Sequence, residues 1–210
     1  MHIAGILEND RTKEIIDTIK YFLYAVNKKV SFSEYAARFK NKQLWNDYLS
    51  ALIQIETEIL VIKIKPRDAD EALRTLPLNT LIVNDYTDWK AICSKNKHDL
   101  GNLFCQIILI LNSDIIKPSN FTDEEKCRLL FYGFSSDSNI TTSSTGEPFA
   151  NGKFLCCIRE GLISANGNVI EPQEFVVNLR NTPGDPYSIL AAASFAVLND
   201  IDMNKLNLMQ

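Results

Sequence analysis

The chain has 210 residues, of which 46% are hydrophobic and 23% are charged, and its net charge is −4. This composition is typical of a globular protein with a sizeable core and excludes a disordered or strongly basic chain. No basic stretch alternates with aromatic residues, so we expect no nucleic-acid interface.

The longest apolar run, residues 189–198, is too short to span a bilayer, and the N-terminus lacks the pattern of a signal peptide. We therefore predict a cytoplasmic protein without a membrane segment. The five cysteines show no spacing typical of a metal or redox site, so no metal is predicted. Three cysteines lie in apolar stretches, where a reduced core thiol is the usual interpretation: Cys105, Cys156 and Cys157.

The first half of the chain alternates predicted strands with predicted helices. Short apolar runs bounded by turn residues predict strands at 2–7, 58–64, 80–83 and 106–112. Apolar residues at the spacing of one helical face predict helices at 11–26, 42–55, 69–73 and 99–104. Short hydrophobic strands separated by helices predict an α/β fold with a mostly parallel central sheet and helices on both faces.

The pattern changes after Pro118. Strand-like segments follow without helices between them, at 129–132, 153–158 and 174–179, and Asn166-Gly167 is a strong hairpin-turn signal. These strands predict a small antiparallel lobe, after which a helix at 187–198 packs back onto the sheet. We therefore predict a single domain, with a parallel α/β core from 1–118 and 185–210 and a small antiparallel lobe from 128–180.

The turn after the first strand lies where related arrangements hold a nucleotide phosphate. A phosphate loop needs glycines, so that backbone N–H groups can wrap the anion, and a lysine for its charge. Here the turn reads Glu8-Asn9-Asp10-Arg11-Thr12, and no glycine occurs between Gly5 and Gly101. Two carboxylates face the position of a polyphosphate, so the phosphate chemistry is missing.

The order of four segments resembles the central, ATP-binding domain of the Mur ligases and folylpolyglutamate synthetases. The segments are 81–88, 109–114, Phe131-Tyr132-Gly133 and 184–192. The resemblance spans nearly the whole chain. It implies a fold like that of the P-loop NTPases and relatives that join an amino acid to a carboxylate through an acyl phosphate.

The departures from this family fall on the catalytic positions. Where the family has Gly-Lys-Thr, this chain has Asp10-Arg11-Thr12-Lys13, with Thr12 at the lysine position, or Lys13 if the register shifts by one. The magnesium-binding glutamate aligns with Lys63, which reverses the charge there. Because phosphoryl transfer depends on the metal and on cationic positioning, ligation is not expected. The degenerate nucleotide-site positions are Gly5, Glu8, Asp10, Thr12, Lys13, Lys63, Asn84, Asp88, Asn112, Asp114, Tyr187 and Ser188.

Three cations at one strand end suggest an anion site that needs no magnesium: Lys63, Lys65 and Arg67. The alternative is a solvated loop, because the acidic residues that follow nearly cancel this charge. Asn84, Asp88, Asn112 and Asp114 have a similar alternative, since these residue types often form turns and caps.

Two functions are consistent with the resemblance. The first, which we favour, is a non-catalytic binding or scaffolding protein with no cofactor, whose partner is an unknown protein or a small anionic ligand. The alternative is an ATP- and magnesium-dependent carboxylate–amine ligase, or a nucleotide-binding protein, of peptidoglycan or polyglutamate metabolism. The retained Asn84, Asp88 and Asn112 favour the second function, and the missing glycines, lysine and glutamate favour the first.

Aromatic residues are more numerous than one helical face needs. Tyr21, Phe22 and Tyr24 crowd the first helix, and three more aromatics follow at helical spacing: Phe32, Tyr35 and Phe39. The family's N- and C-terminal domains have no counterpart in this length, so surfaces that contacted them need another cover. We therefore predict a homodimer with two-fold symmetry, the alternative being that these aromatics fill the protein's own core.

Overall fold

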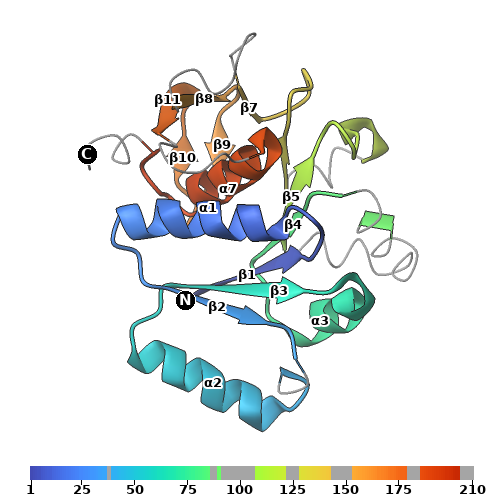
Figure 1. The fold of residues 1–210 in the computed structure, drawn as a ribbon, viewed down its shortest axis with the longest axis vertical. Helices are drawn as coiled ribbons and strands as arrows, with labels where there is room; N and C mark the ends of the chain where they lie inside the picture. Colours follow the sequence, from blue (N-terminus) through green and yellow to red (C-terminus); the bar gives the residue numbers. More distant parts are fainter. Residues whose placement is uncertain are drawn as a thin grey trace.

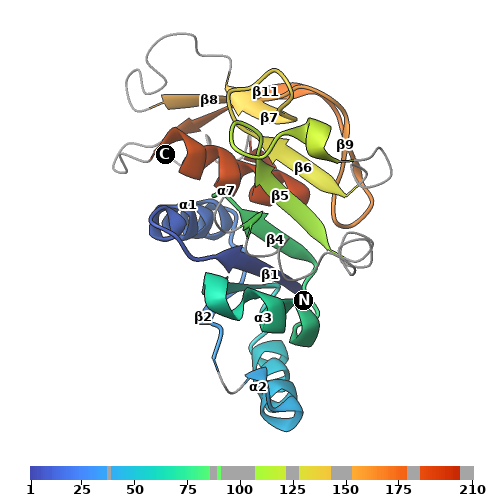
Figure 2. The same cartoon turned by 90° about the vertical axis from the view of Figure 1, so that its right-hand side faces the viewer.

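The computed structural model describes residues 1–36, 39–85, 89–90, 107–121, 128–142, 153–178 and 185–203. The described residues form one nine-stranded sheet in the order β11-β8-β7-β6-β5-β4-β1-β3-β2 (Figures 1 and 2). Its strands are β1 (His2–Leu7), β2 (Val30–Glu34), β3 (Ile59–Ile64), β4 (Thr80–Val83), β5 (Ile108–Asn112), β6 (Leu129–Tyr132), β7 (Ile140–Thr142), β8 (Lys153–Ile158) and β11 (Gln173–Asn178). A separate two-stranded antiparallel sheet is formed by β9 (Leu162–Ile163) and β10 (Val169–Ile170).

Helices cover both faces of the nine-stranded sheet (Figure 1). The helices are α1 (Thr12–Ala25), α2 (Lys42–Gln54), α3 (Ala69–Thr75) and α7 (Pro186–Leu198), with the short 3₁₀ helices η2 (Pro66–Asp68) and η3 (Pro118–Asn120). α1 and α7 lie side by side on one face, and α2 and α3 lie on the other. The predicted α/β fold, a mostly parallel sheet with helices on both faces and a small antiparallel sheet, is confirmed.

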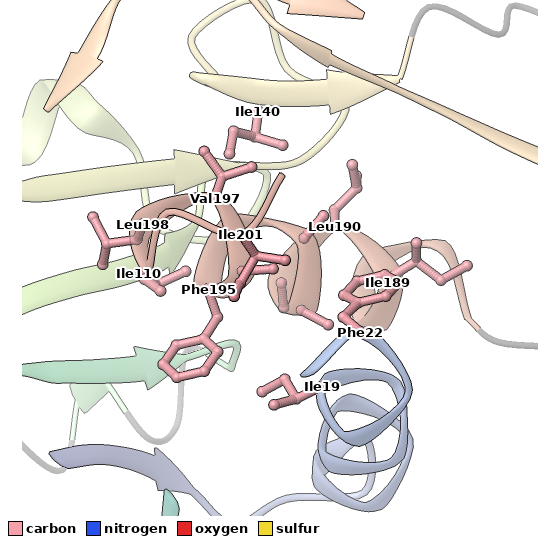
Figure 3. Close-up of a cluster of buried hydrophobic side chains, with 14 of the residues drawn as sticks. Ile19, Phe22, Ile110, Ile140, Ile189, Leu190, Phe195, Val197, Leu198 and Ile201 are labelled. Atoms are coloured by element: carbon pink, nitrogen blue, oxygen red, sulfur yellow. The ribbon is translucent and has the colours of Figure 1, made fainter. Parts of the chain in front are cut away.

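α7 is the centre of the larger core. Every residue of α7 from Ser188 to Leu198 is buried, because the helix lies between α1 and the strands β5, β6 and β7. A helix that is apolar on all sides needs such an enclosed position. Figure 3 shows Ile189 of α7 close to Phe22 of α1, within this core.

The predicted strands and helices of the first half lie within a few residues of the observed ones, with one omission. Residues 30–34, which carry the first of the aromatics expected at helical spacing, form the edge strand β2, parallel to β3. The expectation of helical spacing is therefore wrong, because Phe32 lies on a strand while Tyr35 and Phe39 are buried beyond its end. The predicted helix at 99–104 lies outside the described residues.

The antiparallel strands predicted for the second half continue the central sheet. β7 and β8, and β8 and β11, pair antiparallel at one edge, as expected. β6 instead pairs parallel with β5, so the expected antiparallel pairing is wrong for residues 129–132. The Asn166-Gly167 turn connects β9 and β10, with Gly167 at φ +85°. Among the described residues, no helix combines the length and apolar character needed to cross a membrane.

Candidate functional site

The turn between β1 and α1 is closed by its own hydrogen bonds. The Thr12 hydroxyl accepts a hydrogen bond from the Asn9 N–H (2.7 Å) and donates one to the Leu7 carbonyl oxygen (3.0 Å). The Arg11 N–H donates a hydrogen bond to the Asn9 side-chain oxygen at 2.9 Å, and the Thr12 N–H donates one to the Asn9 carbonyl oxygen at 3.2 Å. A phosphate at a helix N-terminus needs backbone N–H groups of this kind as donors. Three of them are committed here to acceptors within the turn.

Other predicted phosphate-site residues lie around this turn without converging on one point. Asp10 and Lys13 are exposed, whereas Gly5 is buried in the middle of β1. A Cβ at Gly5 would lie 2.9 Å from the terminal methyl groups of Ile64 and Leu81. Gly5 therefore permits close packing inside the sheet and has no part in the turn.

Lys63 links the ends of three parallel strands through two ion pairs. Its ammonium lies 3.2 Å from the Glu8 carboxylate at the end of β1 and also pairs with Glu34 at the end of β2. These bonds raise the pKa of Lys63, and the hydrogen bond from Lys63 lowers the pKa of Glu34. Lys63 therefore stays charged between two carboxylates, and its ammonium occupies the space between them.

The other two cations of the predicted anion site are less well positioned. Lys65 and Arg67 are both exposed, and the Arg67 guanidinium lies 3.8 Å from the Asp68 carboxylate. An anion at this strand end would compete with Glu8 and Glu34 for Lys63. The geometry is that of a neutralised loop rather than a preformed anion cradle.

A second group of polar side chains lies at the carboxyl ends of β4, β5 and β6. Asn112 pairs with Tyr132 in the β5–β6 register, and Asn84 directly follows the end of β4. All three side chains are buried, on the sheet face that α1 and α7 cover. Among the described residues, no hydrogen-bond partner is present for the Nδ2 atoms of Asn84 and Asn112 or the hydroxyl of Tyr132. Buried polar groups of this kind are normally satisfied by protein or ordered water, so this row is an unusual feature.

The start of α1 and the start of α7 meet over this polar row. The Arg11 guanidinium lies 4.9 Å from the centre of the Tyr187 ring, and its Nε is 3.4 Å from Asp185. Burial raises the pKa of Tyr187, and the nearby Asp114 carboxylate raises it further. The charges of Arg11, Asp185 and Asp114 act on the Tyr132 hydroxyl, although burial is the main reason its pKa lies above the usual range.

Asp114 and Ser188 have clear structural roles at the place where the starts of α1 and α7 meet. The Asp114 carboxylate accepts the N–H groups of Phe134 (2.7 Å) and Ser135 (2.8 Å), which holds the loop after β6. The Ser188 N–H donates a hydrogen bond to the carboxylate of Asp185, the N-cap of α7, at 3.2 Å. The interactions of Asp114 match the turn-forming alternative given for this residue.

The predicted site residues are thus divided between two places. Glu8, Thr12 and Lys63 lie on the β1–β3 side, and Asn84, Asn112, Asp114, Tyr187 and Ser188 lie on the β4–β6 side. Asn9 bridges the two places through a hydrogen bond from its Nδ2 to Asn84. Asp88 lies outside the described residues.

Sequence reasoning missed three residues of this site: Arg11, Glu34 and Tyr132 as a buried polar group. Arg11 and Tyr187 open two helices, so placing α1 beside α7 would have paired them. Glu34 had no such signal, because its strand was not predicted. Within the described residues, no group of three His, Cys, Asp or Glu side chains is arranged to hold a metal.

No family model matches the sequence. No curated protein matches it either.

Solved structures with a similar fold do exist. A mutant of the L. casei folylpolyglutamate synthetase (FPGS) has a TM-score of 0.51 and 9% identity, and an FPGS complex with AMPPCP and folate has 0.53 and 12%. A murein peptide ligase from Psychrobacter arcticus 273-4 has a TM-score of 0.53 and 10% identity. The chain has the fold of these ligases. The matches cover 99% of this chain but only 61%, 61% and 45% of those chains, respectively.

Proposed function

We propose that this chain is a non-catalytic relative of the ligases whose fold it shares, and that it acts as a binding or scaffolding protein. The observation that carries the proposal is the closed turn at 8–12, where three N–H groups are hydrogen bonded within the turn. The Glu8–Lys63–Glu34 ion pairs support it, because they place an ammonium where the resemblance expects a magnesium ligand. The cytoplasmic location and the lack of a cofactor stay predictions.

Calorimetric titration of the full chain with ATP, with and without magnesium, tests this proposal. We expect no magnesium-dependent binding, because three N–H groups of the turn already have acceptors within it and the Lys63 ammonium lies where the resemblance expects a magnesium ligand. A micromolar dissociation constant that requires magnesium would overturn it. A titration with inorganic phosphate would detect the separate anion site predicted at Lys63, Lys65 and Arg67. In that case Lys63→Ala should abolish binding, whereas Lys153→Ala, at an exposed lysine elsewhere, should leave it unchanged.

A second candidate is a nucleotide-binding protein or ATP-dependent ligase of peptidoglycan or polyglutamate metabolism. The Nδ2 atoms of Asn84 and Asn112 and the Tyr132 hydroxyl favour it, because buried polar atoms that lack partners within the described part of the chain suit a polar ligand. The FPGS structure with AMPPCP is consistent with that idea. Titration with adenosine and with ATP tests this candidate, because a polar row that receives a nucleoside should bind at least one of them, and binding of neither would contradict the candidate.

We also propose a homodimer. Its support is the exposure of Tyr21 (42%) and Tyr24 (56%) on α1 and of Ile53 (62%) and Ile55 (63%) at the end of α2. Tyr35 and Phe39 no longer contribute to this argument, because they are buried in the chain's own core. Light scattering at micromolar concentration should give twice the mass of one 23.8 kDa chain. Tyr24→Glu should shift the mass toward the monomer if α1 is in the interface.

A further inference from the structure

A cavity lies at the amino ends of β5 and β6, between these strands, the β9–β10 hairpin and the end of α7. Its volume is about 330 Å³, at the lower end of the range for sites that hold small organic molecules. The polar row of Asn84, Asn112 and Tyr132 lies at the carboxyl ends of β4, β5 and β6. The cavity is therefore at the opposite edge of the sheet and is separate from the site described above.

The walls of the cavity are mostly apolar side chains held in place by the fold. Leu162 and Ile170 pair directly across the β9–β10 hairpin and pack against the core that contains Val197 and Leu198 of α7. All four residues line the cavity. The Ala165 N–H donates a hydrogen bond to the Leu198 carbonyl oxygen at 2.8 Å, which holds the hairpin beside the helix. An apolar ligand would therefore meet apolar side chains from two elements that are fixed to each other.

The end of α7 offers little to a positively charged ligand. A helix C-terminus carries partial negative charge on carbonyl oxygens that lack partners within the helix. Here the carbonyl oxygens of residues 195–198 all accept backbone N–H groups, from residues 199–201 and from Ala165. Because these acceptors already have donors within the chain, the ligand preference of the cavity depends on its polar side chains.

Two of the described lining residues have polar side chains, and both present hydrogen-bond donors. The Asn139 Oδ1 accepts the Phe131 N–H at 2.8 Å, so the Nδ2 is the amide atom left for a ligand. Arg128 directly precedes β6, is exposed, and has a guanidinium that can only donate. Arg128 is also the one charged side chain among the described lining residues. The cavity therefore combines an apolar interior with a single positive charge.

We propose that this cavity binds a small apolar carboxylate, a molecule with an aliphatic or aromatic body and one carboxylate end. The body would lie among Leu130, Leu162 and Leu198, where burial of apolar surface supplies most of the affinity. The carboxylate would lie at the rim with Arg128, whose planar guanidinium matches the two oxygens of a carboxylate. An ammonium end would be repelled by Arg128 and would meet no acceptor side chain in the described lining. Medium-chain fatty acids and aryl acids have this chemistry.

The test is an NMR titration of the full ¹⁵N-labelled chain with hexanoate, compared with hexylamine and 1-hexanol. We expect hexanoate to give saturable shifts of amide signals in residues 128–130, 161–163 and 197–198. The two analogues have the same apolar chain without a carboxylate, and each should bind at least about threefold more weakly. No saturable binding of hexanoate, binding of either analogue as tight as that of hexanoate, or shifts confined to other residues would overturn the proposal. The titration contains no nucleotide, so its outcome is independent of the proposed loss of ATP binding.

Substitutions of Arg128 test whether it holds the carboxylate. Arg128→Gln removes the charge of an exposed side chain, so it should weaken binding of hexanoate at least about threefold and leave binding of 1-hexanol unchanged. Arg128→Lys keeps the charge and should bind hexanoate more tightly than Arg128→Gln does. Arg67→Gln is the matched control, because Arg67 is an exposed arginine of η2 away from the cavity lining. The assignment is wrong if Arg128→Gln binds hexanoate like the unchanged chain, if it loses 1-hexanol to the same extent, or if Arg67→Gln weakens hexanoate binding equally.

Discussion

Thr12→Val removes the hydroxyl group that closes the turn between β1 and α1 while keeping the size of the side chain. Thr12 is 2% exposed, and its hydroxyl accepts from Asn9 at 2.7 Å and donates to Leu7 at 3.0 Å. Losing both bonds costs about 2–3 kcal/mol, because two backbone groups lose a partner in a largely buried place. For a chain of 210 residues this corresponds to a fall in Tm of about 4–12 °C.

Urea unfolding followed by circular dichroism measures this cost. Thr12→Ser is the matched control, because it keeps both hydrogen bonds and loses one buried methyl group, worth about 1 kcal/mol. Valine must therefore be more destabilising than serine. If Thr12→Val lowers the free energy of unfolding by less than Thr12→Ser does, the Thr12 hydroxyl does not hold the turn. The N–H groups of the turn would then not be shown to be occupied by internal hydrogen bonds.

Three further outcomes are expected. Burial lowers the pKa of His2 from 6.5 to about 4, so the folded chain prefers the neutral imidazole. The free energy of unfolding should therefore fall by about 2 kcal/mol as the pH drops from 8 to 5. His2→Gln should remove that part of the pH dependence of urea unfolding. Gly133→Ala should lower the free energy of unfolding by at least about 1–3 kcal/mol, as measured by thermal unfolding. The reason is that Gly133 has φ +148° and that a Cβ there would lie 2.7 Å from the Asp114 carboxylate. Burial raises the pKa of the Cys156 thiol, so mass spectrometry should find Cys156 alkylated by iodoacetamide only after unfolding; rapid alkylation of the native chain would contradict its buried position.

The fold was predictable where hydrophobic pattern alone decides it. β1, β3 and β4 are short apolar runs buried on both faces, so their positions follow from the sequence. β2 is an edge strand whose residues are mostly half-buried, and its pattern lacks a continuous apolar run. The direction of β6 could not be predicted, because it depends on the path of the chain between β5 and β6 rather than on the strand's own residues.

The candidate site was predictable in its chemistry but not in its contacts. Glu8 and Lys63 indicated the loss of an anion-binding turn and a magnesium ligand, and the two residues form an ion pair in the structure. The pairing of Lys63 with Glu34 depends on β2 lying beside β3, which the sequence did not reveal. The meeting of Arg11 and Tyr187 depends on the packing of two helices that are more than 150 residues apart in the chain.

The enclosed position of α7 has a consequence for synthesis of the chain. Ile19 and Phe22 of α1 share a core with Ile189 and Phe195 of α7, and that core cannot form until both segments have left the ribosome. Until then the nascent α1 presents an apolar face to its surroundings. Contacts between such distant segments slow folding, and exposed apolar surface favours aggregation and chaperone binding. Folding of this core is therefore completed late, after residues 186–198 have been made.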